Sequence, residues 1–489
     1  MYITIGITQL SGDVRYIQVA LDSSVDALRH QVHNLLGVFK GRLLTASGDV
    51  LRGSRTVEQS GLQNGSLLTL HTEPVYASAS LGAFAAVLGD GSLACWGDSD
   101  RGGDCTAKEC LQNMQVCGIC STRAAFAAIL VNGSVVTWGR PESGGDSSSV
   151  QEHLRDVKRV QSTASAFAAI LSDGSVVTWG LAECGGNSSD VQKQLKNVRQ
   201  IQATYSAFAA LLSDGSVVTW GLPDCGGDST AVQEQLRSVQ FIQSTSLEEG
   251  SAFAAILRDG SVVTWGAAEG GGDSSSAQKQ LKSVLHIQAT NHAFAAILAD
   301  GSVVTWGNPD FGGDCTGVQK QLKGVKCIQA TYSAFAAVLE EGSVVTWGDA
   351  ECGGDSSYAQ KRLQKVECIQ ATHRAFAAIL YDGSVVAWGD PDFGGDCSDV
   401  ESRLLSVQKI QATYFAFAAL LSDGPVVSWG SSTSGGASDH LTKELKHVNS
   451  LQATDFAFLA IKVDGSAVAW GHSELGGDNH AAQFQLRDA

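Results

Sequence analysis

The sequence is poor in the residues that mark membrane proteins, nucleic-acid-binding proteins and disordered chains. Only 17% of its 489 residues are charged, with 33 Lys and Arg against 50 Asp and Glu. No apolar run approaches the ~20 residues of a membrane helix. The shortage of basic residues argues against direct nucleic-acid binding, which relies on Lys and Arg at phosphates. Because 44% of the residues are apolar, we expect a folded chain with a large core.

Sequence motifs for catalysis, cofactors and metals are also missing. There is no phosphate-binding loop, no G-x-S-x-G and no H-E-x-x-H. The one CxxC, at Cys117 and Cys120, falls in a predicted strand, where its side chains would point to opposite faces. We therefore expect no enzymatic activity, no cofactor and no bound metal. Twelve Cys in a chain of this length and no secretory-signal pattern favour a cytoplasmic or nuclear location.

What the sequence has in abundance is glycine and a repeated Trp-Gly dipeptide. There are 55 Gly, and each of the ten Trp is followed by Gly. Successive Trp are 41 residues apart, except for one spacing of 42 and one of 45. The repeats predict two regions, a head of residues 1–74 and ten units covering residues 75–489.

Each unit has the pattern of three strands and a short helix. In residues 198–236 a short alternating segment is followed by a continuous apolar run, as in a strand buried on both faces. Asp214-Gly215 predicts a hairpin turn, and a third segment rich in β-branched residues ends at Trp-Gly. Gly-Gly-Asp follows, and then in eight units a Ser or Thr with Gln or Glu three residues later, such as Ser148 and Gln151. This pattern predicts a capped helix of about two turns.

The pattern AFAAILxDGSVVTWG…GG resembles the regulator-of-chromosome-condensation repeat, and its short period is similar to the blades of β-lactamase inhibitor protein II. The resemblance implies a mainly β fold of three-stranded propeller blades, and the ten units make it a β-propeller-like array of ten blades. Ten exceeds both the seven blades that the family resemblance implies and the 4–8 blades that propellers generally have. Ten equal units can close into one ring, wind as an open spiral or split into seven and three. We favour one continuous array and place a closed ring first.

The first 74 residues resemble ubiquitin, in the order β-β-α-β-β. The likeness rests chiefly on residues 41–71, GRLLTASGDVLRGSRTVEQSGLQNGSLLTLH. It implies a β-grasp domain, with ubiquitin's apolar partner-binding patch falling on Leu10, Leu44 and His71. Two interpretations stay open: a cap on the first blade, or a docking module for the ubiquitin–proteasome system. The same repeats occur in the HECT-type HERC ubiquitin ligases, but we expect no HECT domain here.

The negative charge of -17 recurs at fixed positions of the repeat. Antiparallel strands place the loops after strands one and three at the same rim, so these carboxylates are predicted to form rings on one face. One predicted ring, four residues after Trp, consists of Asp100, Glu142, Glu183, Asp224, Glu269, Asp310, Glu351, Asp392 and Glu474. A second ring is the Asp of Gly-Gly-Asp, for which we favour a role in the turn over ligand binding.

The loop after strand one is the most variable part of the unit and is predicted to bind a partner. Aromatic residues and Arg, which binding surfaces favour, are frequent there. The predicted partner-binding residues are Arg123, Tyr205, His292, Tyr332, His373, Arg374, Tyr414, Phe415 and Phe456. A four-residue insertion at 247–250 falls in the same loop.

Together these observations predict a non-catalytic interaction scaffold. The rim would bind a protein partner, with a basic partner favoured by the acidic face, and the head would dock to ubiquitin–proteasome components. Two alternatives come from the repeat family: guanine-nucleotide exchange on a small GTPase, and inhibition of an enzyme. The ten Trp are predicted to pack the blades.

Overall fold

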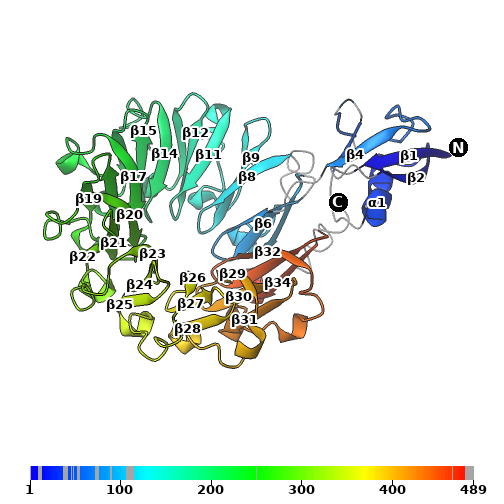
Figure 1. The fold of residues 1–489 in the computed structure, drawn as a ribbon. Coiled ribbons are helices and arrows are strands. Elements are labelled where there is room, and N and C mark those ends of the chain that lie inside the picture. Colours follow the sequence, from blue (N-terminus) through cyan, green and yellow to red (C-terminus); the bar gives the residue numbers. More distant parts are fainter. Residues whose placement is uncertain are drawn as a thin grey trace.

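The computed structural model describes residues 2–8, 14–36, 42–45, 47, 49–51, 55–71, 76–88, 91–105, 115–248, 250–464 and 466–478. Figure 1 shows a ring of small sheets with a separate head beside it. The fold is mainly β, as predicted from the repeats. No helix in the described ranges is long and apolar enough to cross a membrane.

The head is a four-stranded mixed sheet packed on one helix. Its elements are β1 (Tyr2–Thr8), β2 (Val14–Ala20), α1 (Val25–Leu36), β3 (Arg42–Leu44) and β4 (Leu67–His71), in the sheet order β2-β1-β4-β3. β1 and β4 run parallel, and the other pairs are antiparallel. Val25, Leu28 and Val32 are fully buried, as their helical spacing predicted, and the Ser24 hydroxyl caps the helix by accepting from the Ala27 amide at 3.1 Å. The head is thus a β-grasp domain.

The ring consists of ten three-stranded antiparallel sheets, here called blades 1 to 10. Blades 1 to 5 are β5 (Tyr76–Ala79), β6 (Ala83–Val87), β7 (Leu93–Gly97); β8 (Val116–Ser121), β9 (Ala125–Leu130), β10 (Val135–Gly139); β11 (Val157–Ser162), β12 (Ala166–Leu171), β13 (Val176–Gly180); β14 (Val198–Ala203), β15 (Ala207–Leu212), β16 (Val217–Gly221); and β17 (Val239–Ser244), β18 (Ala252–Leu257), β19 (Val262–Gly266).

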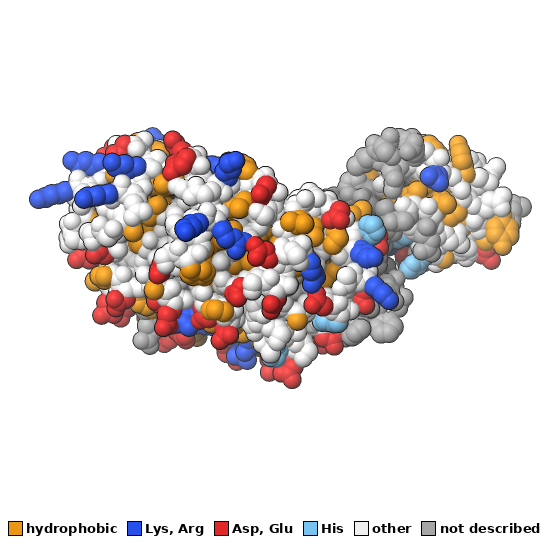
Figure 2. All heavy atoms as spheres, turned by 60° about the horizontal axis from the view of Figure 1, so that its bottom comes forward, with side chains coloured by type: hydrophobic (Ala, Val, Ile, Leu, Met, Phe, Trp, Pro, Cys, Tyr) orange, Lys and Arg blue, Asp and Glu red, His pale blue; other side chains and the backbone are white. Residues whose placement is uncertain are grey.

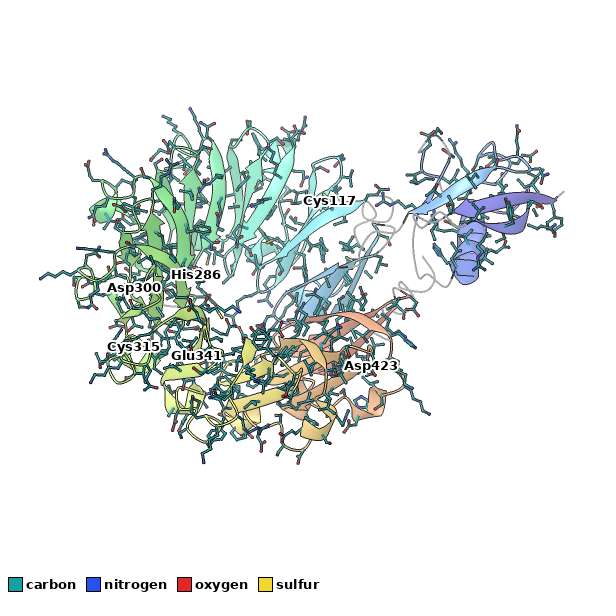
Figure 3. All side chains as sticks on the ribbon, viewed as in Figure 1. Cys117, His286, Asp300, Cys315, Glu341 and Asp423 are labelled. Carbon is teal, nitrogen blue, oxygen red and sulfur yellow. A yellow bond between two sulfur atoms is a disulfide. The ribbon has the colours of Figure 1, made fainter. Side chains whose placement is uncertain are left out.

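Blades 6 to 10 repeat the same arrangement. They are β20 (Val284–Ala289), β21 (Ala293–Leu298), β22 (Val303–Gly307); β23 (Val325–Ala330), β24 (Ala334–Leu339), β25 (Val344–Gly348); β26 (Val366–Ala371), β27 (Ala375–Leu380), β28 (Val385–Gly389); β29 (Val407–Ala412), β30 (Ala416–Leu421), β31 (Val426–Gly430); and β32 (Val448–Ala453), β33 (Ala457–Lys462), β34 (Ala467–Gly471). Hairpin turns join the second and third strands, and Asp300 and Glu341 occupy that turn in blades 6 and 7 (Figure 3).

Each blade packs on the next through a Phe–Trp pair and a Gly. In blade 3, Phe167 lies opposite Trp179 and stacks on it at 5.2 Å between ring centroids. The Trp179 indole donates to the carbonyl of Gly144 in the preceding blade at 3.0 Å. Gly144 has φ of +91°, and a Cβ there would lie 2.6 Å from the Phe167 ring. The conformation and the space both require glycine.

The ring closes. The Trp96 indole of blade 1 donates to the carbonyl of Gly476, after blade 10, at 3.1 Å. Phe84, Ala86 and Trp96 of blade 1 share a buried cluster with Ala457 and Leu459 of blade 10. The closed ten-blade ring favoured from the spacing is therefore confirmed over the open spiral and the split array.

The predicted two-turn capped helix is not present in the described units. A single 3-10 turn follows each third strand: η1 (Ser99–Arg101), η3 (Pro141–Ser143), η5 (Ala182–Cys184), η6 (Pro223–Cys225), η8 (Ala268–Gly270), η9 (Pro309–Phe311), η10 (Ala350–Cys352), η11 (Pro391–Phe393), η13 (Ser432–Ser434) and η15 (Ser473–Leu475). After Gly-Gly the chain forms turns, with a 3-10 turn in four units: η4 (Gln151–His153), η7 (Thr230–Val232), η12 (Glu401–Arg403) and η14 (Asp439–Leu441).

The residues assigned to a capping box have another role. The Gln151 amide donates to the carbonyl of Val135 in the third strand at 2.9 Å, and its oxygen accepts from the Ser147 hydroxyl at 2.9 Å. The Gln side chain therefore ties the connecting segment to its own blade. Sequence spacing could not distinguish this long-range bond from a local helix cap.

Candidate functional site: an aromatic and acidic rim

The loops after the first and third strands lie together at one rim of every blade, as the strand order predicted. In blade 2 the Thr122 hydroxyl donates to the Ser143 carbonyl at 3.0 Å, and the Arg140 amide donates to the Ala124 carbonyl at 2.8 Å. The same pair of loops meets in the other blades. Variable residues of two loops per blade therefore share one surface.

All nine carboxylates of the predicted acidic ring lie on this rim and are exposed. They fall in the first turn of the 3-10 helices, and in four of these turns an Asp or Asn two residues earlier accepts the backbone hydrogen bond, as Asp98 does from the Asp100 amide at 3.0 Å. Glu351 contacts Arg374 at 3.4 Å. Figure 2 shows acidic side chains along the lower edge of the ring, where basic side chains are fewer.

The Asp of Gly-Gly-Asp is held within its own turn. Asp146 accepts from the Ser148 amide at 2.9 Å, and Asp228 and Asp273 accept from the equivalent amides at 2.8 and 2.9 Å. These bonds lower the pKa of Asp228 and Asp273. The geometry supports the structural role favoured from the sequence.

Aromatic side chains from blades 6 to 10 form one continuous cluster on the rim. We define the aromatic rim as His292, Phe311, Tyr332, His373, Phe393, Tyr414, Phe415, Phe456 and His472. Adjacent ring centroids lie between 4.2 and 6.4 Å apart. Six of these residues belong to the predicted set, and another predicted residue, Arg374, lies over the Phe393 ring at 5.5 Å.

Three members of the aromatic rim were not among the predicted residues. Phe311, Phe393 and His472 belong to the variable segment after Trp-Gly, not to the loop after strand one. The antiparallel strand order already predicted that the loops after strands one and three share a rim. Applying it to the aromatics as well as to the carboxylates would have found them.

The remaining predicted residues meet on the ring axis. Loops from every blade line a cavity of about 600 Å³, here called the axial pocket, whose lining includes Arg123, Tyr205, Glu248, Tyr414 and Asp455. The Arg123 guanidinium lies over the Tyr205 ring at 5.4 Å and donates to the Tyr205 hydroxyl. Residues more than 300 positions apart in the sequence therefore share one pocket.

Burial shifts the pKa of titratable side chains in and near the axial pocket. Removal from water raises the pKa of Asp455 to about 6, against the opposing hydrogen bond from the Tyr414 hydroxyl and the charge of Arg123. Burial, with the charge of Asp455, raises the pKa of Tyr414 to about 12. Burial also lowers the pKa of His373 and His292, which favours their neutral forms.

The predicted ubiquitin-like patch on the head is only partly described. Leu10 lies outside the described residues, Leu44 is half-buried on β3, and the His71 backbone pairs with Arg42. The apolar side chains most exposed on the head sheet are instead Tyr2, Val14, Tyr16 and Leu67. Val14, Tyr16 and Leu67 surround Gly6, where a Cβ would lie 3.0 Å from Leu67.

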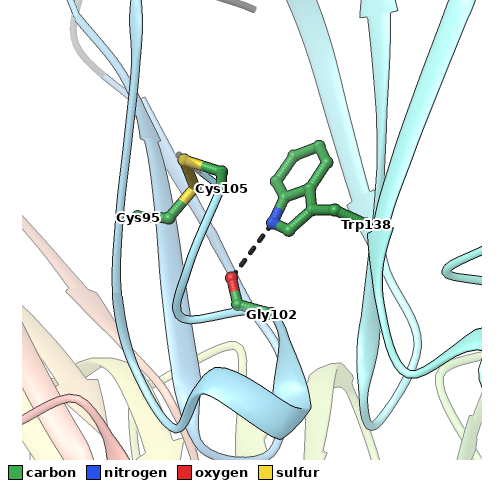
Figure 4. The surroundings of a disulfide bond; sticks show 4 residues. All are labelled: Cys95, Gly102, Cys105 and Trp138. Atoms are coloured by element: carbon green, nitrogen blue, oxygen red, sulfur yellow. Dashed lines mark hydrogen bonds between the residues drawn. A yellow bond between two sulfur atoms is a disulfide. The ribbon is translucent and has the colours of Figure 1, made fainter. Parts of the chain in front are cut away.

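One disulfide joins Cys95 to Cys105 within blade 1, beside Trp138 (Figure 4). Its two cysteines come from the third strand of the blade and from the segment after Gly-Gly-Asp. The side chains of Cys117 and Cys120 bond to the Ile129 carbonyl and the Ser162 hydroxyl respectively, so they take different partners, as alternation predicted. Within the described ranges no three His, Cys, Asp or Glu residues group as metal ligands.

No family model and no curated protein matches the sequence. Among solved structures, a chain in the crystal structure of Kap60 bound to yeast RCC1 (Prp20) is 18% identical with a TM-score of 0.33, covering 59% of this chain and 72% of that chain. The CRINKLY WD40 ectodomain of the Arabidopsis thaliana receptor kinase ACR4 is 17% identical with a TM-score of 0.28, covering 54% and 92%. Caldiarchaeum subterraneum ubiquitin is 24% identical with a TM-score of 0.14, covering 15% and 96%.

The fold class is defined by the sheets themselves. Ten three-stranded blades with one interface pattern, closed by the contact between Trp96 and Gly476, make a ten-bladed β-propeller. A β-grasp head precedes it. Fold alone does not determine function, so the function must be argued from the rim.

Proposed function

We propose that this protein is a non-catalytic interaction scaffold whose aromatic rim binds a protein partner. The observation that carries the proposal is the contiguous cluster of nine aromatic side chains on one rim, which also carries the exposed carboxylates of the acidic ring. Aromatic residues dominate the centres of protein interfaces, whereas charged residues at the edge set association rate and specificity. The identical blade frame beneath the cluster holds it rigidly, which lowers the entropic cost of binding.

Affinity capture with a double variant tests this function. Phe415→Ser with Phe456→Ser removes two rings from the cluster centre and is expected to lose at least nine-tenths of a specifically captured protein. The matched control is Tyr381→Ser, because Tyr381 is 64% exposed in a hairpin turn on the opposite rim. Equal capture by the double variant and the native protein would contradict the proposal.

We further propose that the head docks to ubiquitin–proteasome components. Support comes from its β-grasp topology and from the exposed apolar residues Tyr16 and Leu67 on its sheet. A Tyr16→Ser, Leu67→Ser variant should lose proteasome or ligase subunits while keeping the rim partner. Loss of both partners, or of neither, would contradict separate docking sites.

Guanine-nucleotide exchange stays the main alternative. The insertion in blade 5 projects Glu248 into the axial pocket, and both backbone groups of Leu247 bond to the Ser251 hydroxyl, at 2.9 and 2.7 Å. This anchored loop is the feature that could engage a GTPase. Capture of a small GTPase that is strongest without nucleotide would favour exchange over a scaffold role. Capture of an enzyme with loss of its activity would favour an inhibitor.

A further inference from the structure

The axial pocket combines features that select a positively charged side chain. Its lining includes two carboxylates, Asp455 and Glu248, and among the described lining residues Arg123 is the one Lys or Arg. Tyr332 and Tyr414 supply aromatic walls, together with His373, whose pKa is lowered by burial. Aromatic faces and a partly buried carboxylate attract a guanidinium or an ammonium group.

The protein's own Arg123 shows which group the pocket accepts. Its guanidinium lies over Tyr205 and donates to the Tyr205 hydroxyl. Three other rings form a second wall of the pocket: Tyr332 and His373 lie 4.3 Å apart and His373 and Tyr414 lie 5.3 Å apart between ring centroids. In the described part of the chain, no Arg lies over the ring of Tyr332, His373 or Tyr414. A second cation therefore has a place beside Asp455.

Anionic ligands fit the pocket poorly. The exposed carboxylates of the acidic ring lie on the same rim as the pocket, and negative charge there repels a negative group while attracting a positive one. Arg374, the other cation near the cluster, is already paired with Glu351 at 3.4 Å and Asp390 at 3.1 Å. A volume of about 600 Å³ accommodates one long side chain with its flanking backbone.

We propose that the axial pocket binds an Arg side chain at the tip of a partner's loop, between the Tyr332–Tyr414 wall and the Asp455 carboxylate. This inference rests on the proposed scaffold function and names the chemistry of the partner at that site. The aromatic rim then contacts the apolar residues that flank the Arg. Arg is favoured over Lys because its planar group stacks on rings and bonds a carboxylate in two places.

The direct test uses a disulfide-cyclised peptide with a single Arg at its tip and its citrulline counterpart, which has the same shape without the charge. Isothermal titration at pH 7.5 should detect binding of the Arg peptide at least tenfold tighter than that of the citrulline peptide. Asp455→Asn should weaken the Arg peptide at least fivefold. Asp396→Asn, an exposed rim carboxylate away from the axis, should change affinity less than twofold.

A variant that is expected to tighten binding of the Arg peptide separates a binding role of the pocket from a structural one. Arg123→Gln removes the internal cation, so the Arg peptide should bind at least threefold tighter, whereas a merely disrupted pocket would bind it more weakly. Equal affinity for the two peptides, or no effect of Asp455→Asn in a protein with native circular dichroism, would overturn the inference. If Asp455→Asn still captures the rim partner while the Phe415, Phe456 double variant does not, the scaffold function stands and the Arg pocket fails.

Discussion

Trp96 and Gly476 are 380 residues apart, yet the indole of the first blade donates to the glycine carbonyl after the tenth at 3.1 Å. The same bond joins every neighbouring pair of blades, as between Trp306 and Gly271 at 3.0 Å. The closing interface is therefore chemically the same as an internal one. A repeat array that closes in this way has no exposed end blade to protect.

Disturbing the closing glycine should open the ring at one place. Gly476 has φ of +100°, and a Cβ there would lie 2.8 Å from the Phe84 ring, so Gly476→Ala is expected to destabilise the protein by about 1–3 kcal/mol. Hydrogen exchange should rise in β7 and around η15. Gly271→Ala is the matched control, because it should raise exchange between blades 5 and 6 instead. Exchange unchanged at the blade 1–blade 10 junction would contradict the role of this contact.

The disulfide of blade 1 replaces a hydrogen bond found in other blades. Where blade 1 has Cys95 and Cys105, blade 2 has Thr137 and Ser147, whose hydroxyls lie 3.0 Å apart. The double variant Cys95→Thr, Cys105→Ser should therefore fold with the native circular dichroism spectrum. Its thermal unfolding should show a loss of about 2–3 kcal/mol, since a disulfide constrains the unfolded chain more than a hydrogen bond does.

Because these two positions are equivalent in every blade, we expect that a second disulfide can be introduced in another blade. Blade 6 has Thr305 at the position of Cys95 and the following segment has Cys315 at that of Cys105. Thr305→Cys should form a disulfide with Cys315 under oxidising conditions, detected by mass spectrometry of non-reduced peptides. Thr264→Cys is the control, because its partner position holds Ser274 and no new disulfide is expected. A free thiol at both positions of the first variant would contradict the equivalence.

In several units a Gln side chain ties the connecting segment to its own blade, a contact here called the Gln clamp. This contact predicts a stability difference between two nearby glutamines. The Gln278 amide donates to the Val262 carbonyl at 3.0 Å and its oxygen accepts from Ser274 at 3.0 Å, whereas Gln280, which is equally exposed, is not part of these bonds. Gln278→Ala should lower the free energy of unfolding by about 1–3 kcal/mol, because it leaves partly buried polar groups unpaired. Gln280→Ala should change it by less than about 0.5 kcal/mol. Urea unfolding measures both, and equal effects would rule out the clamp.

Asp455 should make stability depend on pH in a defined direction. Burial raises its pKa from 3.8 to about 6, so the folded protein holds this proton more tightly than the unfolded chain does. The associated stability is present below pH 3.8 and is lost as pH rises through 6, by at most about 3 kcal/mol. Tyr414 and Arg123 face this carboxyl and oppose the shift.

The variant Asp455→Asn cannot titrate, so its stability relative to the native protein should increase between pH 4 and pH 7. Urea unfolding at both pH values measures the difference, and Asp396→Asn controls for general charge effects. Parallel pH profiles for native protein and Asp455→Asn would show that this carboxyl is not buried as described.

Much of the ring could be predicted from single residues. The Trp spacing gave the blade number, the apolar run gave the central strand and Asp-Gly gave the hairpin turn. The capped helix was wrong because Gln151 bonds to a strand carbonyl 16 residues earlier, a contact that mimics helix-cap spacing in sequence. The continuity of the aromatic rim could not be predicted either, since it depends on how far each blade turns relative to the last.

The sequence by itself determined the blade, its repeat number and the rim on which the variable residues lie. These follow from strand alternation and antiparallel order, which are local. Only the tertiary structure decided that the ring closes, that Cys95 meets Cys105, and that Arg123, Tyr414 and Asp455 meet on one axis. Those outcomes depend on the small rotation between blades summed over ten units, and no local pattern in the chain encodes that sum.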